Sequence, residues 1–275
     1  MGEVAGSSPA WSTFLLYMNR QIIIKGTLVS YAEHGPEGSP AVVFLHGWRS
    51  NKEAWNGMVT RLTASQNNQS GSRRLIAIDL PGFGASEAPK SAYSVSDYAE
   101  IVAEFISKLT LTSVSLIGHS FGGRVAIKLA AQKPKLIQKL ILIDSGGFRD
   151  ESSKKNILKA GAKIVKPFFA HSFMRPLRAK IYKSIGAEDY VATPVIQETF
   201  MKVIGEDLTE DIQKISAPTL LIWGAKDAET PPSFGTRMNK LIAGSKLSVI
   251  AGAGHFSFID KPDETAKLVG DFLTA

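Results

Sequence analysis

Short apolar runs recur along the chain, and most of them are rich in β-branched residues. They occupy residues 41–45, 75–78, 114–117, 140–143, 219–223 and 247–250. None of these runs alternates cleanly between apolar and polar positions. Continuous apolar runs of this length are typical of strands that are buried on both faces, as in a parallel sheet covered by helices.

Between the runs, apolar positions follow the period of an α-helix. In residues 95–109 the apolar side chains recur at the spacing of one helix face, and residues 264–273 predict a closing helix. Residues 20–33 predict an antiparallel hairpin that turns near Lys25 and Gly26. The alternation of strands and helices predicts an α/β fold with a doubly wound, mostly parallel sheet and helices on both faces.

The alternation stops between residues 148 and 216. This stretch has helical periodicity and no convincing strand, and Ala217-Pro218 then precedes the next apolar run. The pattern predicts a helical cap, residues 148–216, inserted between two strands of the sheet. Residues 1–147 and 217–275 would form the core, with residues 1–12 as a loose leader.

The composition limits the chemistry. The chain has 275 residues, enough for one large α/β core with an insertion, and it has no cysteine. Disulfides, a thiol nucleophile and cysteine-bound metals are therefore excluded. We see no secretory signal in the first residues and no apolar stretch long enough to cross a bilayer, so we expect a cytoplasmic protein without a transmembrane segment.

The formal net charge of +7 is concentrated in one segment. Residues 151–186 contain nine basic residues and one acidic residue, a net charge of +8, so the rest of the chain carries −1. No recognised nucleic-acid motif accompanies this segment, and we expect no nucleic-acid partner. Weak contact of the basic cap with anionic surfaces remains open. We expect a monomer or a homodimer.

A serine, an aspartate and a histidine each follow one of the predicted strands. Ser120 follows the run at 114–117, Asp227 the run at 219–223, and His255 the run at 247–250. In open α/β sheets, functional groups gather beyond the carboxyl ends of the strands. A serine hydroxyl becomes a nucleophile when an imidazole takes its proton and a carboxylate orients that imidazole. The order serine, acid, histidine predicts a catalytic triad, with Asp144, after the run at 140–143, as the alternative acid.

Ser120 itself lies where a predicted strand turns sharply into a predicted helix. Gly118 and Gly122 flank it at a spacing of two residues, which leaves room for a crowded backbone. An ordinary tight turn with a capping serine would also fit this pattern. The accompanying acid and histidine favour a nucleophile elbow.

Five segments in combination resemble the α/β-hydrolase superfamily, in its branch with a serine nucleophile and a helical cap. They are residues 44–47 (FLHG), 79–86 (DLPGFGAS), 118–123 (GHSFGG), 224–227 (GAKD) and 254–255 (GH). The resemblance implies an eight-stranded type of sheet and the triad Ser120, Asp227 and His255. It also implies an oxyanion hole formed by the backbone N–H groups of Trp48 and Phe121. A minority of the superfamily carries its acid at the place of Asp144.

The resulting prediction is a carboxylesterase, a serine hydrolase that cleaves small or medium-sized esters through an acyl-enzyme intermediate. The alternatives are a carbon–carbon bond hydrolase of ring-cleavage products, a lactonase and an amidase. The first of these commonly has a methionine after the nucleophile and a tryptophan after the histidine, where this chain has Phe121 and Phe256. A receptor-like, ligand-binding member of the fold is the non-enzymatic alternative, and the intact triad disfavours it.

Other polar residues of these segments are expected to be structural. Asp79 opens a Pro-Gly turn, His46 shapes the loop after its strand, and His119 packs in the interior. The five histidines show no paired metal-binding spacing, so we expect no metal. No G-x-G-x-x-G motif follows the first core strand, so we expect no cofactor.

Overall fold

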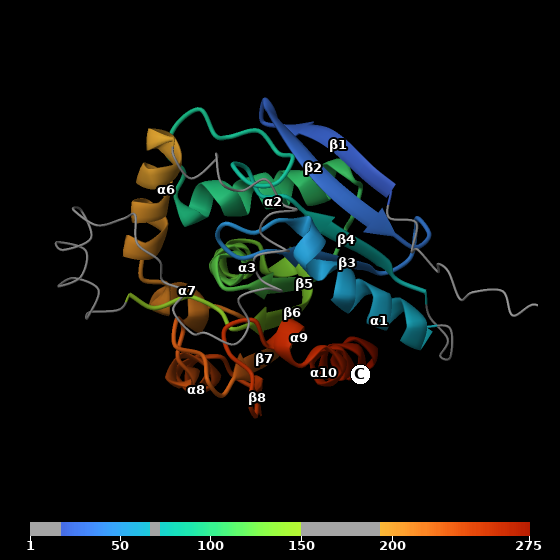
Figure 1. Cartoon of the computed structure of the whole chain (residues 1–275). Helices are drawn as coiled ribbons and strands as arrows, with labels where there is room; N and C mark the ends of the chain where they lie inside the picture. Colours follow the sequence, from blue (N-terminus) through green and yellow to red (C-terminus); the bar gives the residue numbers. More distant parts are fainter. Residues whose placement is uncertain (1–17, 67–71, 150–192) are drawn as a thin grey trace, which may run out of the picture.

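The computed structural model describes residues 18–66, 72–149 and 193–275. Its centre is one eight-stranded sheet in the order β1-β2-β4-β3-β5-β6-β7-β8 (Figure 1). The neighbours β1–β2 and β2–β4 are antiparallel, and all other neighbours are parallel. The strands are β1 (Met18–Ile24), β2 (Thr27–His34), β3 (Ala41–Leu45), β4 (Arg74–Ile78), β5 (Val114–His119), β6 (Ile137–Ile143), β7 (Thr219–Gly224) and β8 (Lys246–Ile250). This sheet confirms the fold class predicted from the sequence.

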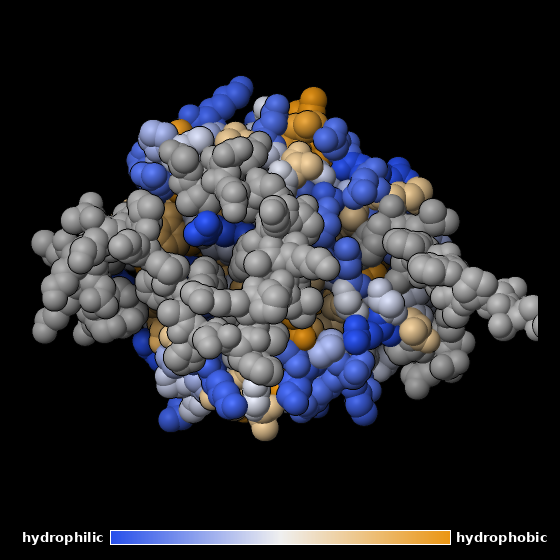
Figure 2. Space-filling view, in the orientation of Figure 1, coloured by the Kyte–Doolittle hydropathy of each residue, from blue (hydrophilic) through white to orange (hydrophobic). Residues whose placement is uncertain are grey.

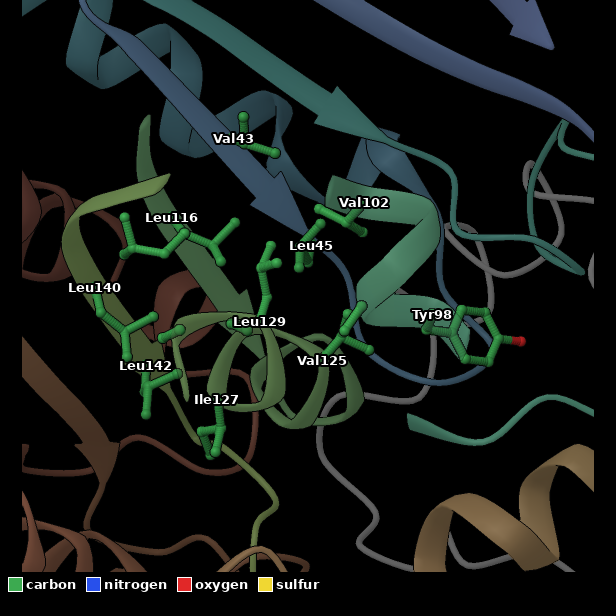
Figure 3. Packing of buried hydrophobic residues seen from close by; sticks show 14 of the residues in the cluster. Val43, Leu45, Tyr98, Val102, Leu116, Val125, Ile127, Leu129, Leu140 and Leu142 are labelled. Carbon is green, nitrogen blue, oxygen red and sulfur yellow. The ribbon is translucent and has the colours of Figure 1, made fainter. Parts of the chain in front are cut away.

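Helices cover both faces of the sheet, and each face has its own apolar cluster. The helices α2 (Val95–Lys108), α3 (Phe121–Gln132) and α8 (Pro232–Leu241) pack on one face. The helices α1 (Asn56–Gln66), α9 (Ser257–Asp260) and α10 (Pro262–Thr274) pack on the other. Two short 3₁₀ helices lie in connecting segments: η1 (Lys52–Trp55) between β3 and α1, and η2 (Pro134–Leu136) between α3 and β6. Figure 3 shows the first cluster, in which side chains of β3, β5 and β6 meet those of α2 and α3.

The first two strands form the predicted hairpin. Ile24 pairs with Thr27, so the turn consists of Lys25 and Gly26. Both turn residues have positive φ, 48° and 76°, which suits the twist of a two-residue hairpin. The predicted hairpin and its turn are therefore confirmed, although the strands begin two residues before and end one residue after the predicted range of 20–33.

The last strand corrects one expectation. The apolar run at 247–250 predicts a strand buried on both faces, but within β8 only Ile250 is buried. The side chain of Val249 is 50% exposed. The reason is the place of β8 at the edge of the sheet, where β7 is its one neighbour among the described strands.

The described part of the predicted cap contains two helices, α6 (Pro194–Gly205) and α7 (Thr209–Gln213). The helix α6 lies against the segment before α2, where Lys202 Nζ donates to the Ala92 carbonyl at 3.0 Å. The Tyr93 N–H donates to Thr199 Oγ1 at 3.1 Å. The basic segment 151–186 and the predicted leader lie outside the described residues, and the domain boundaries stay predictions.

The visible described surface is mostly hydrophilic, with an apolar area near the β1–β2 hairpin (Figure 2). Two residues of β1, Met18 and Ile23, are among the exposed large apolar side chains, at 51% and 60%. None of the helices in the described ranges is long and apolar enough to span a membrane.

Candidate active site

Ser120 lies between β5 and α3 in a backbone conformation that side chains rarely adopt, with φ 50° and ψ −111°. A Cβ atom on Gly118 would lie 2.5 Å from the Gly122 carbonyl oxygen. A Cβ atom on Gly122 would lie 2.2 Å from the Leu45 carbonyl oxygen. The turn is thus too tight for side chains at either flanking position, which explains the G-x-S-x-G spacing physically.

The structure brings His255 and Asp227 to this serine. His255 Nε2 lies 3.0 Å from Ser120 Oγ. On the other side of the ring, His255 Nδ1 lies 3.0 Å from Asp227 Oδ2 and 3.1 Å from Oδ1. The carboxylate favours the proton on Nδ1, so Nε2 is left to accept the serine hydroxyl proton.

Asp227 is held in place by the loop that follows it. The Glu229 and Thr230 N–H groups donate to Asp227 Oδ1 at 2.9 and 3.0 Å. Thr230 Oγ1 donates to Asp227 Oδ2 at 2.8 Å and also lies 3.2 Å from His255 Nδ1. No motif in the sequence indicates Thr230 as a positioning residue, because its role depends on how this loop folds back on the carboxylate.

The alternative acid, Asp144, has other partners. Its carboxylate accepts hydrogen bonds from the Gly224 N–H at 2.7 Å and the Ser257 N–H at 2.9 Å. Burial raises the pKa of Asp144 from 3.8 to about 7, and these hydrogen bonds offset only part of that rise. No hydrogen bond joins its carboxylate to His255 within the described part of the chain. Asp144 instead ties the end of β7 to the start of α9.

Two further histidines lie at the site without facing the serine hydroxyl. His119 Nε2 lies 2.7 Å from the backbone carbonyl oxygen of His255, and burial holds the pKa of His119 well below 6.5. His46 donates from Nδ1 to the Gly47 carbonyl at 2.8 Å and accepts at Nε2 from the Leu80 N–H at 3.0 Å. Both arrangements agree with the packing and loop-shaping roles expected from the sequence.

Asp79 also has a structural environment. It is fully buried and pairs with Lys52, whose Nζ lies 2.7 Å from Asp79 Oδ2. The Lys52 and Ala85 N–H groups donate to the same carboxylate at 2.7 and 3.0 Å. These bonds fix the loop after β4 against the start of η1, as the Pro-Gly turn suggests. Across the described ranges, no group of three or more His, Asp or Glu side chains is arranged to hold a metal ion.

Two backbone N–H groups adjoin Ser120. Phe121 is the first residue of α3, where a backbone N–H has no acceptor within the helix. Trp48 follows Gly47, and a Cβ atom on Gly47 would lie 3.4 Å from Ser120 Cβ, so this loop lies directly against the serine. Neither N–H donates to another residue in the part of the chain that is described.

An aromatic cluster packs around the side chain of Trp48. The Trp48 ring lies 4.9 Å from that of Phe83 and 5.1 Å from that of Phe121, between centroids. It also lies 5.1 Å from the ring of Phe200, which belongs to α6. The helix α6 therefore contacts the loop that carries Trp48.

A second carboxylate lies beside His255. Glu229 Oε2 lies 3.3 Å from His255 Nε2, on the nitrogen that also contacts Ser120. Burial lowers the pKa of His255, but the hydrogen bond that His255 donates to Asp227 and the charges of Asp227 and Glu229 outweigh it, so the pKa is raised above 6.5. No sequence motif indicates Glu229, since its nearness to His255 follows from the loop geometry alone.

A family model described as the alpha/beta hydrolase family matches residues 42–268. The chain belongs to this family. The match spans the strands and loops that carry Trp48, Ser120, Asp227 and His255.

Relatives within the family include lipases and esterases. Lipase 1 of Psychrobacter immobilis is 26% identical over 261 residues, which cover 89% of this chain and 80% of the lipase. The esterase EaEST of Exiguobacterium antarcticum is 28% identical in sequence, with a TM-score of 0.80 over 94% of this chain and 100% of that chain. The enol-lactonase of Burkholderia xenovorans LB400 shares the fold, with a TM-score of 0.79 over 93% of this chain and 100% of that chain, at 22% identity.

Proposed function

We propose that this alpha/beta hydrolase is a serine esterase that cleaves carboxylic esters of small or medium-sized substrates. The observation that carries the proposal is the continuous line of contacts from Ser120 Oγ through His255 to Asp227, with 3.0 Å on each side of the imidazole. The esterase and the lipase among the relatives support the same class of reaction.

In the first half of the reaction, His255 Nε2 takes the proton of Ser120 as Oγ bonds to the ester carbonyl carbon. The carbonyl oxygen becomes an oxyanion and accepts hydrogen bonds from the Trp48 and Phe121 N–H groups. Removing one such donor typically slows turnover by ~100- to 1000-fold. The protonated Nε2 then gives its proton to the alcohol oxygen as the carbon–oxygen bond breaks, which leaves an acyl-enzyme.

In the second half, water replaces the alcohol. His255 takes a proton from the water molecule, whose oxygen bonds to the acyl carbon. The second tetrahedral intermediate collapses, the proton returns to Ser120 Oγ, and the carboxylic acid leaves. Asp227 stays ionised throughout and stabilises the imidazolium form of His255.

The substrate's apolar part would lie against the aromatic cluster of Trp48, Phe83, Phe121 and Phe200. This cluster adjoins the oxyanion donors, and Phe200 belongs to the cap helix α6. Such rings offer a large apolar surface at low conformational cost. A small acyl group would contact the rings of Trp48 and Phe121, and a longer one would reach Phe200 of α6.

Turnover of a substrate panel tests the proposal. p-Nitrophenyl esters of increasing acyl length, a lactone, an anilide and a dienone acid would be compared with the wild-type protein and the Ser120→Ala variant. We expect the esters to be hydrolysed at the highest kcat/KM, and the Ser120→Ala variant to lose this activity while keeping its circular dichroism spectrum. Preferred cleavage of the dienone acid, the lactone or the anilide would contradict the esterase assignment.

A further inference from the structure

Two carboxylates flank the imidazole of His255, one at each ring nitrogen. Asp227 contacts Nδ1, is buried, and is the acid of the proposed triad. Glu229 Oε2 lies 3.3 Å from Nε2, and its side chain is 38% exposed. Nε2 is the nitrogen through which every proton of the proposed reaction passes, so Glu229 faces the reacting groups, whereas Asp227 lies behind the ring.

The alcohol part of an ester must come close to Glu229. To receive its proton, the alcohol oxygen has to lie within hydrogen-bond distance of His255 Nε2, about 3 Å. Glu229 Oε2 is 3.3 Å from the same nitrogen, so the two oxygens are at most roughly 6 Å apart at that moment. That separation is shorter than the screening length of about 10 Å at 0.1 M salt. A charge on the alcohol part therefore interacts with the carboxylate.

We propose that Glu229 is a specificity-determining residue that selects esters by the charge of their alcohol part. Esters with a cationic alcohol part are favoured, and esters with an anionic alcohol part are disfavoured. The inference rests on the proposed esterase function, because it takes the direction of proton transfer from it.

The side chain and the backbone of Glu229 make different contacts, so a substitution can remove the carboxylate and keep the backbone hydrogen bond. The Glu229 N–H donates to Asp227 Oδ1 at 2.9 Å, and a change of side chain leaves this bond in place. The charges of two other described carboxylates, Asp227 and Asp144, also act on His255, but these residues are 4% and 0% exposed. Glu229 is the carboxylate of this group that a bound substrate can reach.

The size of the effect follows from Coulomb's law. In choline and 2-hydroxyethanesulfonate the charged group lies two carbons beyond the ester oxygen, about 4 Å from it, so the alcohol chain can place it ~6 Å from the Glu229 carboxylate. Two unit charges at that distance, with an effective dielectric constant of about 40 to 80, change a rate by about threefold to tenfold. The Glu229 charge raises the rate for a cationic alcohol part by this factor and lowers the rate for an anionic one by the same factor, so the ratio of the two rates changes by its square. Loss of the Glu229 charge should therefore change their ratio of kcat/KM by about tenfold or more.

The test uses acetate esters of three alcohols of similar size: choline (cationic), 3,3-dimethylbutanol (neutral) and 2-hydroxyethanesulfonate (anionic). kcat/KM would be measured at low salt for the full-length wild type, Glu229→Gln and Glu229→Lys. We expect the choline-to-sulfonate ratio to fall in Glu229→Gln and to fall further in Glu229→Lys. Glu37→Gln is the matched control, because Glu37 is an exposed carboxylate before β3, at the amino end of a strand whose carboxyl end leads to the site. It should leave the ratio unchanged.

An unchanged choline-to-sulfonate ratio in both Glu229 variants, with turnover that still depends on Ser120, would overturn the inference and leave the esterase function intact. An equal fall of the ratio in Glu37→Gln would also overturn it, since the effect would then come from the net charge of the protein. Failure of the wild type to hydrolyse any ester through Ser120 would instead contradict the proposed function itself, and the inference with it.

Discussion

Asp227 and Asp144 follow neighbouring strands of the sheet, yet their carboxylates have different partners. Asp227 contacts the imidazole of His255, and Asp144 accepts from the backbone of Gly224 and Ser257. The sequence places both acids at the same edge, and it ranks Asp227 first only through a family resemblance. Which of the two acids contacts His255 depends on the course of the loops after the strands, and the order of residues in the sequence does not determine that course.

Replacing each acid by its amide should separate their roles. Asp227→Asn should reduce kcat by orders of magnitude, since the same change costs about 10⁴-fold in a serine protease through loss of the correct imidazole tautomer. Asp144→Asn should act mainly on stability, because its contacts join β7 to α9. Steady-state kinetics beside thermal unfolding would measure both effects. A dead enzyme from Asp144→Asn with an active Asp227→Asn would reverse the assignment.

The buried carboxyl group of Asp144 should also make the free energy of unfolding depend on pH. Its pKa in the folded protein is about 7, raised from 3.8 by burial, so the folded state binds this proton more tightly than the unfolded state. Its contribution to stability is complete below 3.8 and is lost as the pH rises through about 7. The wild type should therefore lose stability relative to Asp144→Asn across this interval in urea titrations. A difference that is constant with pH would contradict the raised pKa.

The acidic limb of the pH–rate profile should report His255. The imidazole must be neutral to accept a proton, so kcat/KM falls as the pH drops below its pKa. The carboxylates of Asp227, Glu229 and Asp144 all raise that pKa, against the opposing effect of burial, and the packed ring beside it, His119, is held neutral. Glu229→Gln removes one of these charges. Its acidic limb should move to lower pH on a neutral ester; a limb that stays in place or moves upward would show that Glu229 has no electrostatic effect on His255.

At the scale of the elements, the nucleophile elbow depends on close backbone approach. Gly118→Ala and Gly122→Ala would place a methyl group 2.5 and 2.2 Å from carbonyl oxygens of Gly122 and Leu45. Each should lower the free energy of unfolding by about 1–3 kcal/mol and reduce turnover, because backbone must shift to relieve the contact. Gly205→Ala, at the end of α6 with nothing within 4 Å of the added methyl, is the control. Equal urea midpoints for all three variants would contradict this account of the turn.

Elements with long apolar patterns were predictable, and elements with sparse ones were not. The prediction matches β3 at both ends, and the helix predicted at 95–109 is α2. The sequence pattern did not single out α1 or α8. Within α8, a Cβ atom on Gly235 would lie 2.7 Å from the Trp223 ring. Gly235 therefore packs against the core, although a glycine does not count as apolar in the sequence pattern. Hydrophobic periodicity is insensitive to that kind of contact.

At the scale of the whole molecule, chain topology made the meeting of Ser120, His255 and Asp227 predictable, whereas the residues around them could not be predicted in this way. Parallel strands end at one sheet edge, so Ser120, Asp227 and His255 could be expected there from their order alone. Thr230 and Glu229 have no such signal. Their contacts with Asp227 and His255 arise from the course of one loop between β7 and α8.

The uneven charge of the chain leads to a prediction about substrate encounter. The segment 151–186 carries +8, and it lies outside the described residues. Its attraction for anions would be screened within about 10 Å at 0.1 M salt. An ester with a carboxylate on its acyl part should therefore lose kcat/KM steeply as salt rises, while a neutral ester of equal size barely responds. Replacing Lys155, Lys159 and Lys163 with glutamine should flatten the response; equal salt responses of both esters in the wild type would leave these lysines as solubilising surface.

The most direct measurement of the central claim is covalent labelling by a fluorophosphonate, which reacts with an activated serine. After labelling at neutral pH, peptide mapping by mass spectrometry identifies the modified residue. The account predicts one adduct per chain, on Ser120, and its loss in Ser120→Ala and, through the unpaired serine hydroxyl, in His255→Ala. An adduct on another serine, or undiminished labelling of Ser120→Ala, would contradict the assignment of Ser120 as the nucleophile.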